Sequence, residues 1–372
     1  MAQGIEMRLV QQLFIASTVL LLFFSCEPLA TQFEDVGGAE IYRAAYLSKE
    51  PDIAPFIKVM TWNIRFGAAR LPWFGDSCGD RVILSEQEVT DHLRALADLI
   101  NSVQPDILFV QEIDVGSKRT AYIDELQWLL DHTELNYAAY ASAWKARIIP
   151  SDGLGRMDMG NAVLSRFPIT QATRLQLALR GDQDALTQYF YLQRNILKTK
   201  VQLPGDEQIY AVNTHLAAFS TDDTKRIQVG QVLDELTQID QYGELFVLGA
   251  DFNLLPPGSD STDYCLEDRC AGESFHHSGD NPFHKEGSNY TPEITWLQEM
   301  YNRFSPAVAL NAYLADQPRY FTHTTQFDAL PDRKIDYLFT NGRWAPGSDS
   351  TIQSGIRLSD HAPVSAKLEI GQ

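Results

Sequence analysis

The chain has 372 residues, of which 44% are hydrophobic, and its formal net charge is −19. This length suits one large domain or two ordinary ones, and the composition allows a sizeable core. The acidic balance argues against a broad surface that binds polyanions, because contacts to many phosphates need Lys and Arg. A small substrate that contains phosphate is compatible with this charge.

Residues 1–25 are expected to form a signal peptide. Residues 13–24 are almost entirely apolar, a stretch too short for an ordinary membrane span that suits the core of an export signal. Phe23-Phe24-Ser25-Cys26 resembles a bacterial lipoprotein processing site, so we expect export and lipidation of Cys26. An ordinary signal peptide cut nearby and an uncleaved anchor are the alternatives. The expected location is the bacterial periplasm, the outer membrane or the cell surface, or otherwise the medium.

Residues 26–54 are mixed and polar, which predicts a tether to a folded domain. Residues 55–372 are expected to form that domain. Cys265 and Cys270 lie close together in an irregular segment and could form a disulfide in an oxidising compartment. Cys78 is then expected to be a buried or unpaired thiol.

Strand and helix patterns alternate along residues 55–372. Ser85 and Glu88 form a capping-box pattern, and apolar residues at helical spacing predict a helix from there to about Ile100. Further helices are expected at residues 122–130, from Asp222, and at 295–301. Strands are expected at residues 57–62, 107–110, 160–165, 196–203, 209–212, 245–248, 334–339 and 364–368.

Residues 254–292 are rich in Gly, Pro, Ser, Asp and His. The stretch is too long for a simple connection, which indicates a functional loop or an insertion. Its histidines could form a metal cluster, but their spacing is not distinctive, so we favour ordinary loop residues: His276, His277 and His284.

Polar side chains repeatedly follow the predicted strands. Asn63 comes directly after one strand, and the alternative is a loop Asn that caps its own turn. Glu112 follows the apolar run 107–110, where an unpaired charge would be costly to bury, so the position favours a ligand. His215 follows another strand, although a lone His there is more often structural.

Asp251 and Asn253 follow the buried strand predicted at 245–248. If the extended geometry continues, positions i and i+2 point the same way, although Asp-x-Asn also makes turns. Asp360 and His361 form a tight polar corner before the last strand. Because ligand sites in α/β folds gather beyond strand ends, these side chains are candidates for one site.

The motifs that carry these residues resemble those of the endonuclease/exonuclease/phosphatase superfamily. They occur in the family's order over residues 57–369, and Ala250 replaces a frequent Gly. The resemblance implies a four-layer α/β/β/α sandwich, in which two packed β-sheets are flanked by helices. The motifs are Thr61-Trp62-Asn63-Ile64-Arg65, Gln111-Glu112-Ile113-Asp114, Asn213-Thr214-His215-Leu216, Gly249-Ala250-Asp251-Phe252-Asn253, Ile335-Asp336-Tyr337 and Ser359-Asp360-His361-Ala362-Pro363.

The resemblance also implies a metal site. Glu112 would bind a divalent cation with Asn63 beside it, and Asp360 would complete the surroundings. A hard cation with oxygen ligands suits a phosphate ester, which predicts Mg²⁺, with Mn²⁺ as a substitute.

The remaining motif residues would act on the ester. Asp251, expected to be ionised at neutral pH, would orient or deprotonate the attacking water, and Asn253 would hold the phosphoryl group. His215 would act as an acid or charge stabiliser. His361 would bind a phosphoryl oxygen, and Asp336 would hold its imidazole.

The sequence therefore predicts an exported, metal-dependent phosphoesterase that hydrolyses a phosphodiester by direct attack of an activated water. The expected partner is a lipid headgroup, a nucleic acid or a small phosphodiester, with membrane association through a lipidated Cys26. We expect a monomer. The alternatives are a secreted nuclease or phosphomonoesterase of the same family and an inactive binding protein on this fold.

Overall fold

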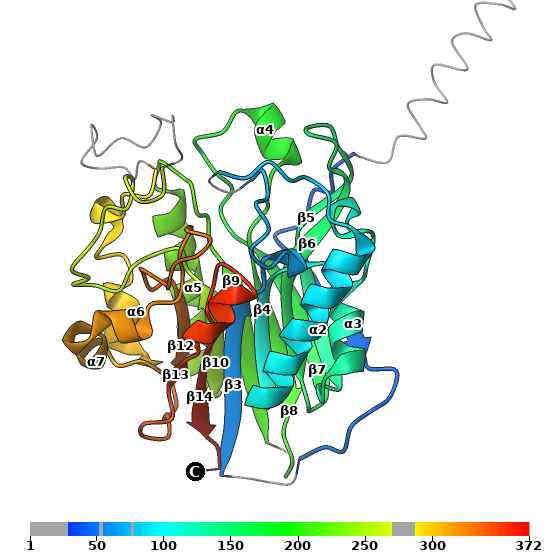
Figure 1. Cartoon of the computed structure of the whole chain (residues 1–372). Coiled ribbons are helices and arrows are strands. Elements are labelled where there is room, and N and C mark those ends of the chain that lie inside the picture. The colour runs from blue at the N-terminus through cyan, green and yellow to red at the C-terminus, as the bar shows by residue number, and fades with distance from the viewer. Residues whose placement is uncertain (1–28, 52–54, 76–77, 206, 270–286, 372) are drawn as a thin grey trace, which may run out of the picture.

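Two seven-stranded β-sheets pack face to face, and helices cover their outer faces (Figure 1). The structure is a computed structural model, and it describes residues 29–51, 55–75, 78–205, 207–269 and 287–371. The arrangement is the four-layer α/β/β/α sandwich, so the predicted fold is confirmed.

Each sheet is mixed. β3 and β4 are parallel neighbours in the first sheet, and β9 and β10 are parallel neighbours in the second. The first sheet has the order β13 (Ser350–Thr351), β14 (Val364–Glu369), β3 (Phe56–Asn63), β4 (Ile107–Asp114), β6 (Gly155–Ser165), β5 (Tyr137–Ile149) and β2 (Glu40–Arg43). The second has the order β1 (Val36–Gly38), β7 (Ile169–Gln176), β8 (Asn195–Gln202), β9 (Gln208–His215), β10 (Phe246–Asp251), β12 (Asp336–Thr340) and β11 (Ser305–Pro306).

Helices pack on the outer faces of the sheets. α2 and α3 contribute to one outer core, and α5 and α6 contribute to the other. The α-helices are α2 (Glu86–Val103), α3 (Glu125–His132), α4 (Ala185–Phe190), α5 (Thr224–Gln241), α6 (Gln298–Arg303) and α7 (Leu310–Ala315). Short 3₁₀ helices occur at η1 (Arg65–Gly67), η2 (Lys118–Thr120), η3 (Thr291–Glu293), η4 (Gln317–Tyr320) and η5 (Gln353–Arg357).

The central strands alternate between two apolar cores. In β4, Ile107 and Phe109 face the core between the sheets, whereas Leu108 and Val110 face the helices. The sheets approach closely where Phe109 lies over Gly249, because a Cβ at that position would be 2.4 Å from the ring. Central strands buried on both faces explain the continuous apolar runs in the sequence.

The start of α2 follows the sequence pattern. Ser85 is the N-cap, its Oγ accepts from Glu88 N at 3.3 Å, and Glu88 Oε2 accepts from Ser85 N at 2.8 Å. The helix expected at 122–130 begins later, at Glu125, because Tyr122 has a φ of +61° that is incompatible with a helix. The helix expected at 295–301 is likewise shifted, to α6.

Part of the predicted tether belongs to the sheets. β1 pairs with β7 and β2 pairs with β5, so residues 36–43 add one strand to each sheet. The strands β5 and β7 were themselves absent from the sequence-based prediction. Residues 1–25 and Cys26 lie outside the described residues, and within the described part no helix is long and apolar enough to cross a membrane.

The expectation for Cys78 was wrong, and the possible pairing of Cys265 with Cys270 is not found. Cys265 is a buried thiol, whose pKa burial raises to about 12, and it is not half of a disulfide. Cys78, which was expected to be a thiol, is disulfide-bonded. Cys270 lies outside the described residues, as do His276, His277 and His284.

Candidate active site

The predicted site residues meet where the two sheets end. The carboxyl ends of β3 and β4 lie together, and Asp251 on β10 is in register with His215 on β9. The two sheets are joined here, since Asn63 Nδ2 at the end of β3 donates to Asp251 Oδ2 at 3.0 Å. In Figure 1 these ends lie at the top of the sandwich, below α4.

Asp251 lies at the centre of the group. Its Oδ2 is 3.3 Å from His215 Nε2 and 3.7 Å from His361 Nε2, in addition to the bond from Asn63. Burial raises the pKa of Asp251 to about 7, although His361 and hydrogen bonds oppose this shift. Burial in the described protein thus works against the ionised carboxylate that is expected at neutral pH.

Glu112 reaches this group through an irregular backbone. It has a φ of +55° and lies in a β-bulge between Val110 and Ile113. Its Oε1 is 3.3 Å from Asn63 Nδ2 and 3.9 Å from His215 Nδ1. A left-handed backbone at a Glu costs free energy and is found mainly at functional positions.

The two histidines differ in charge. Burial, together with Arg194 and His361, holds the pKa of His215 well below its usual value. Burial also disfavours a charged His361, but Asp336 and Asp251 outweigh it and raise the pKa of His361 well above its usual value. At neutral pH, His215 is therefore neutral and His361 is an imidazolium.

Asp336 fixes the His361 ring. The carboxylate oxygens of Asp336 lie 2.9 and 3.1 Å from His361 Nδ1, and the Asp336 side chain is fully buried at the start of β12. On the other side, Trp62 Nε1 donates to the His361 backbone oxygen at 2.9 Å. The ring is thus positioned from both sheets, with Nε2 turned toward Asp251.

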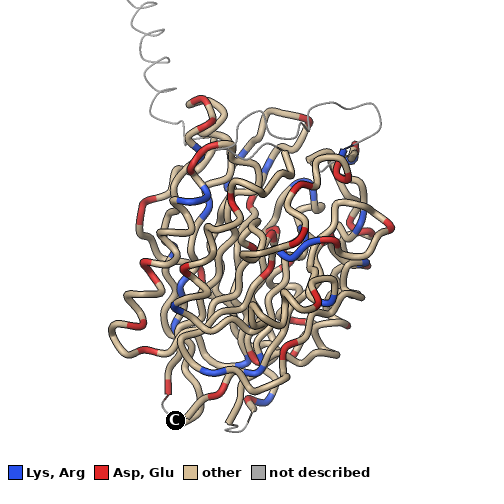
Figure 2. Tube along the Cα trace, turned by 90° about the vertical axis from the view of Figure 1, so that its left-hand side faces the viewer, with Lys and Arg blue, Asp and Glu red and all other residues tan. Residues whose placement is uncertain are grey.

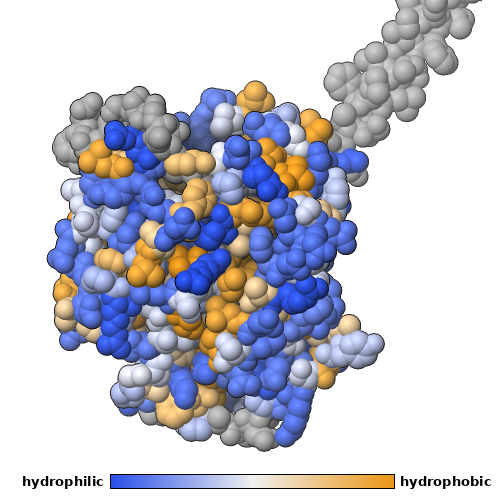
Figure 3. All heavy atoms as spheres, viewed as in Figure 1, coloured by the Kyte–Doolittle hydropathy of each residue, from blue (hydrophilic) through white to orange (hydrophobic). Residues whose placement is uncertain are grey.

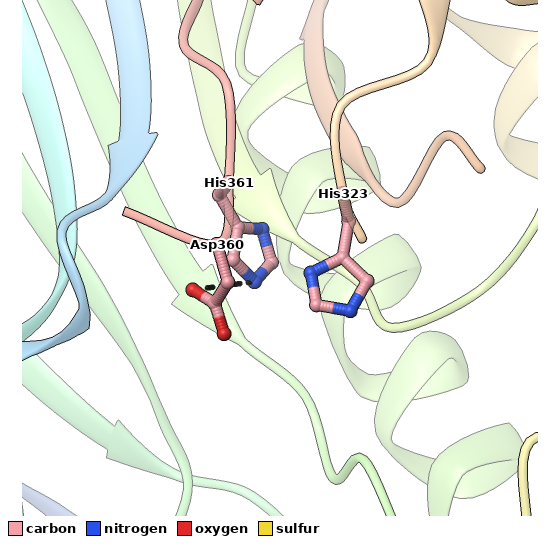
Figure 4. A group of neighbouring side chains, drawn as sticks. All are labelled: His323, Asp360 and His361. Atoms are coloured by element: carbon pink, nitrogen blue, oxygen red, sulfur yellow. Dashed lines mark ion pairs between the residues drawn. The ribbon is translucent and has the colours of Figure 1, made fainter. Parts of the chain in front are cut away.

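Asp360 lies beside the imidazolium, as Figure 4 shows. It is 3.9 Å from His361 Nε2 and 3.6 Å from Arg65 Nε. Burial disfavours its charged form, but His361 and Arg65 lower the pKa of Asp360 to about 2. The His323 ring lies next to that of His361, with centroids 4.5 Å apart (Figure 4).

Asn253 is held by main-chain bonds. Its backbone has a φ of +51°, its N donates to Asp251 Oδ1 at 3.0 Å, and its Nδ2 donates to Leu216 O at 3.2 Å. The side chain nevertheless lines the same cavity as Asp251. The Asp-x-Asn segment therefore forms both the predicted polar pair and a local turn.

The described residues include groups that could hold a metal ion. By distance alone, the candidates are His323, Asp360 and His361, or Asp251, Asp336 and His361. Both sets contain the His361 imidazolium, which repels a cation. The side chains of Glu112 and Asp360 are partly exposed, and their carboxylate oxygens suit a hard divalent ion better. Asn63 presents its amide nitrogen to both Glu112 and Asp251, which favours a positioning role over direct ligation.

Two cavity residues were missed by the sequence analysis. Arg194 lies directly before β8 and is largely buried, and its guanidinium Nε has no hydrogen-bond partner among the described residues. His323 carries a buried Nδ1 without a hydrogen-bond partner in the same part of the chain. Neither residue belongs to a local pattern, so only the tertiary structure reveals them.

Most of these side chains border one cavity of about 670 Å³, although Asn63 and Asp336 do not line it. Its volume is within the usual range for small-molecule sites. The site residues among its lining are Glu112, Arg194, His215, Asp251, Asn253, His323, Asp360 and His361.

The family model of the endonuclease/exonuclease/phosphatase family matches residues 60–361. The chain belongs to this family. Its members hydrolyse phosphoester bonds, so this chain has a phosphoesterase fold together with acidic and histidine groups that could bind a metal. No curated protein matches the sequence.

Solved structures with this fold are only distantly similar in sequence. An endonuclease/exonuclease/phosphatase from Beutenbergia cavernae DSM 12333 shares 18% identity with a TM-score of 0.51, covering 86% of this chain and 72% of that one. The human Nocturnin catalytic domain with bound sulfate shares 17% with a TM-score of 0.51, covering 90% and 98%. A family protein from Leptotrichia buccalis C-1013-b shares 14% with a TM-score of 0.51, covering 84% and 100%. These likenesses show the fold alone.

Proposed function

We propose that this chain is an exported, divalent-metal-dependent phosphoesterase that hydrolyses a phosphodiester by direct attack of an activated water. The observation that carries the proposal is the meeting of Asn63, Glu112, His215, Asp251 and His361 at short distances. Buried ionisable groups with displaced pKa values that cluster in a cavity are typical of catalytic sites.

Asp251 would orient the attacking water and accept its proton, and its pKa of about 7 suits this exchange at neutral pH. The water oxygen bonds to phosphorus, one P–O ester bond breaks, and the departing alcohol takes up a proton. The products are a phosphate monoester and an alcohol. A divalent cation held by Glu112 and Asp360 would neutralise charge on the phosphoryl oxygens when bound, and Mg²⁺ or Mn²⁺ suits these donors.

The other cavity residues would bind the phosphoryl group. His361 carries a positive charge that Asp336 stabilises, so its Nε2–H is suited to a phosphoryl oxygen. His215, which is neutral, would donate one hydrogen bond to charge that develops in the transition state. Asn253 would hold a further phosphoryl oxygen from the turn after β10.

A nuclease is the second candidate, and the charge distribution disfavours it. Acidic and basic residues are interspersed along the described chain (Figure 2), whereas a nucleic-acid strand needs a basic groove. A phosphomonoesterase would use the same groups. An inactive binding protein is disfavoured because each motif position carries a residue suited to its catalytic role.

Export and lipidation are part of the proposal and have a test of their own. Replacing Cys26 with Ser should move the protein from the membrane fraction to the soluble fraction of a bacterial host. Unchanged fractionation would refute the lipid anchor, with no bearing on catalysis. A monomer is expected in either case, and sedimentation of the full chain tests it.

The enzymatic proposal is tested by hydrolysis of bis-p-nitrophenyl phosphate by the full chain with Mg²⁺, with Mn²⁺ and with EDTA. We expect turnover only with metal, and a loss of roughly 10²-fold or more in Asp251→Asn and His361→Ala. Asp240→Asn, which changes an exposed carboxylate at the end of α5, is the matched control. A folded protein that hydrolyses no ester would favour the binding protein.

A further inference from the structure

The cavity that contains the site has a second, apolar part. Eight of its lining residues belong to one hydrophobic cluster that contains none of the carboxylates and imidazoles of the site, and six of them are used here. We name this set the apolar wall: Trp73, Phe74, Trp144, Ile149, Leu154 and Phe190. A phosphoryl group is polar and does not need an apolar surface. The apolar wall is therefore suited to another part of the substrate, which should be apolar.

The apolar wall is a packed structure. Trp144 Nε1 donates to the Phe190 backbone oxygen at 2.7 Å, which ties β5 to α4. The rings of Trp73 and Phe74 meet edge to face, with centroids 4.7 Å apart. Because the wall is fixed by these contacts, it offers a preformed apolar surface to a ligand.

Exposed apolar side chains surround the mouth of the cavity. Leu186 is 69% exposed and Phe219 is 61% exposed, and both line the cavity. Ile148 and Leu29 are about half exposed next to the wall, where Arg147 N donates to Leu29 O. Figure 3 shows apolar atoms at the top edge of the molecule and in the upper centre of this face, beside hydrophilic ones. Apolar groups gathered at a cavity mouth mark an interaction site.

The start of the described chain lies at the same place. Ala30 packs into the hydrophobic cluster of the wall, and its N donates to Tyr189 Oη at 3.4 Å. Cys26 is three residues before Leu29 in the sequence, and a link of this length reaches roughly 10 Å at most. A chain attached to a membrane near Cys26 would therefore hold this cavity close to the lipid surface.

We propose that the substrate is a lipid phosphodiester presented at a membrane surface. Its phosphoryl group reaches Asp251 and His361 while its apolar chain lies on the apolar wall, and Leu186 and Phe219 contact the surrounding lipid. The inference rests on the proposed function and names the substrate class of the same site.

A nucleic acid is the competing ligand, because aromatic side chains also stack on bases. Two features of this part of the cavity disfavour it. Ile149 and Leu154 supply aliphatic surface, on which a base cannot stack as it does on an aromatic ring. The nearby Arg119 guanidinium is buried and donates to Asp114 at 2.8 and 2.9 Å, so it is not available to bind a backbone phosphate.

The test uses methyl, butyl and octyl p-nitrophenyl phosphodiesters, which share one leaving group, with the full chain and Mg²⁺. We expect kcat/KM to rise at least roughly tenfold from the methyl to the octyl ester, since each buried methylene is favourable. In Trp144→Ala and Phe190→Ala the ratio of the octyl to the methyl kcat/KM should shrink to about threefold or less.

A second arm places a hexadecyl p-nitrophenyl phosphodiester in phosphatidylcholine vesicles. In Leu186→Gln and Phe219→Gln, both at exposed positions, the ratio of the vesicle rate to the rate on the soluble octyl ester should fall at least roughly tenfold, since apolar contact with the lipid is lost. Tyr242→Gln is the control, since Tyr242 is 77% exposed at the end of α5. Vesicle rates equal to this control would overturn membrane presentation.

The remaining outcomes separate the two proposals. Hydrolysis that is independent of alkyl length, or faster on an oligothymidylate than on the octyl ester, overturns the lipid substrate and leaves the phosphodiesterase standing. Failure of the folded protein to hydrolyse any of these esters overturns the phosphodiesterase itself.

Discussion

The Asp336 carboxylate and the His361 imidazole form a buried pair, with Oδ2 and Nδ1 2.9 Å apart. The pair links the start of β12 to the corner before β14, and therefore joins the two sheets at the site. Because Asp336 stabilises the imidazolium, it sets both the charge and the direction of the ring that faces Asp251.

Asp336→Asn should lower catalytic activity by removing the charge that holds the His361 imidazolium. Asn keeps the shape but loses the negative charge, so the imidazolium is no longer stabilised and we expect kcat to fall by about 10- to 100-fold. Steady-state kinetics on bis-p-nitrophenyl phosphate measures this, with Asp240→Asn as the isosteric control. A kcat equal to that of the control would contradict the role given to Asp336.

Glu112→Gln should weaken the response to metal much more than the stability. Glu112 is partly exposed at a bulge and its carboxylate does not pack in the core. We expect the Mg²⁺ concentration for half-maximal activity to rise at least about tenfold, with a melting temperature within about 2 °C of the original. A large drop in melting temperature with an unchanged metal response would refute this.

Arg194→Ala should lower kcat/KM without lowering stability. The guanidinium is buried and makes no ion pair among the described residues, so its removal relieves a desolvated charge. Loss of a charge-assisted bond to the phosphoryl group should cost about tenfold or more in kcat/KM. Arg194→Lys should recover part of this loss, and Arg226→Ala at an exposed position of α5 is the control. Reduced stability with unchanged kinetics would mean that Arg194 is structural.

The ion pair of Asp268 with Arg333 should stabilise the fold at neutral pH and lose this effect in acid. The Asp268 carboxylate is buried and accepts hydrogen bonds from Arg333 at 2.7 and 2.8 Å. Burial disfavours the charged carboxylate, but the interaction with Arg333 outweighs burial and lowers the pKa of Asp268 from 3.8 to about 2. Because the folded-state pKa is lowered, the stabilisation is complete above pH 3.8 and is lost as pH falls toward 2. This predicts that Asp268→Asn lowers the free energy of unfolding by about 2 kcal/mol at pH 7 and by roughly half of that at pH 3.

Urea unfolding of both proteins at pH 7, 5, 4 and 3 measures the difference. A difference that stays constant over this range, or grows at low pH, would show that the pair does not shift the Asp268 pKa in this direction.

The sequence was informative wherever the cause of a feature is local. The Ser85 and Glu88 box begins α2 because both partners lie within one turn. The continuous apolar runs marked β4 and β10, and the polar residues after them marked Glu112 and Asp251.

Features that depend on distant contacts could not be predicted from the sequence. Residues 36–43 read as polar linker, and they become strands only because β5 and β7 offer free edges. The positive φ of Glu112 occurs in the β-bulge that β4 forms against β6, and no pattern of residues in the sequence predicts this bulge. Arg194 and Cys78 likewise acquire their roles from partners or a cavity far away in sequence.

The most direct test of the account is the position of Mn²⁺ in crystals of the full chain, located by anomalous scattering. We expect one or more Mn²⁺ ions ligated by the Glu112 carboxylate, with oxygen ligands at about 2.0–2.3 Å. An ion bound only to His323, Asp360 and His361, or only outside the cavity, would contradict the central claim that Glu112 holds the cation beside Asp251.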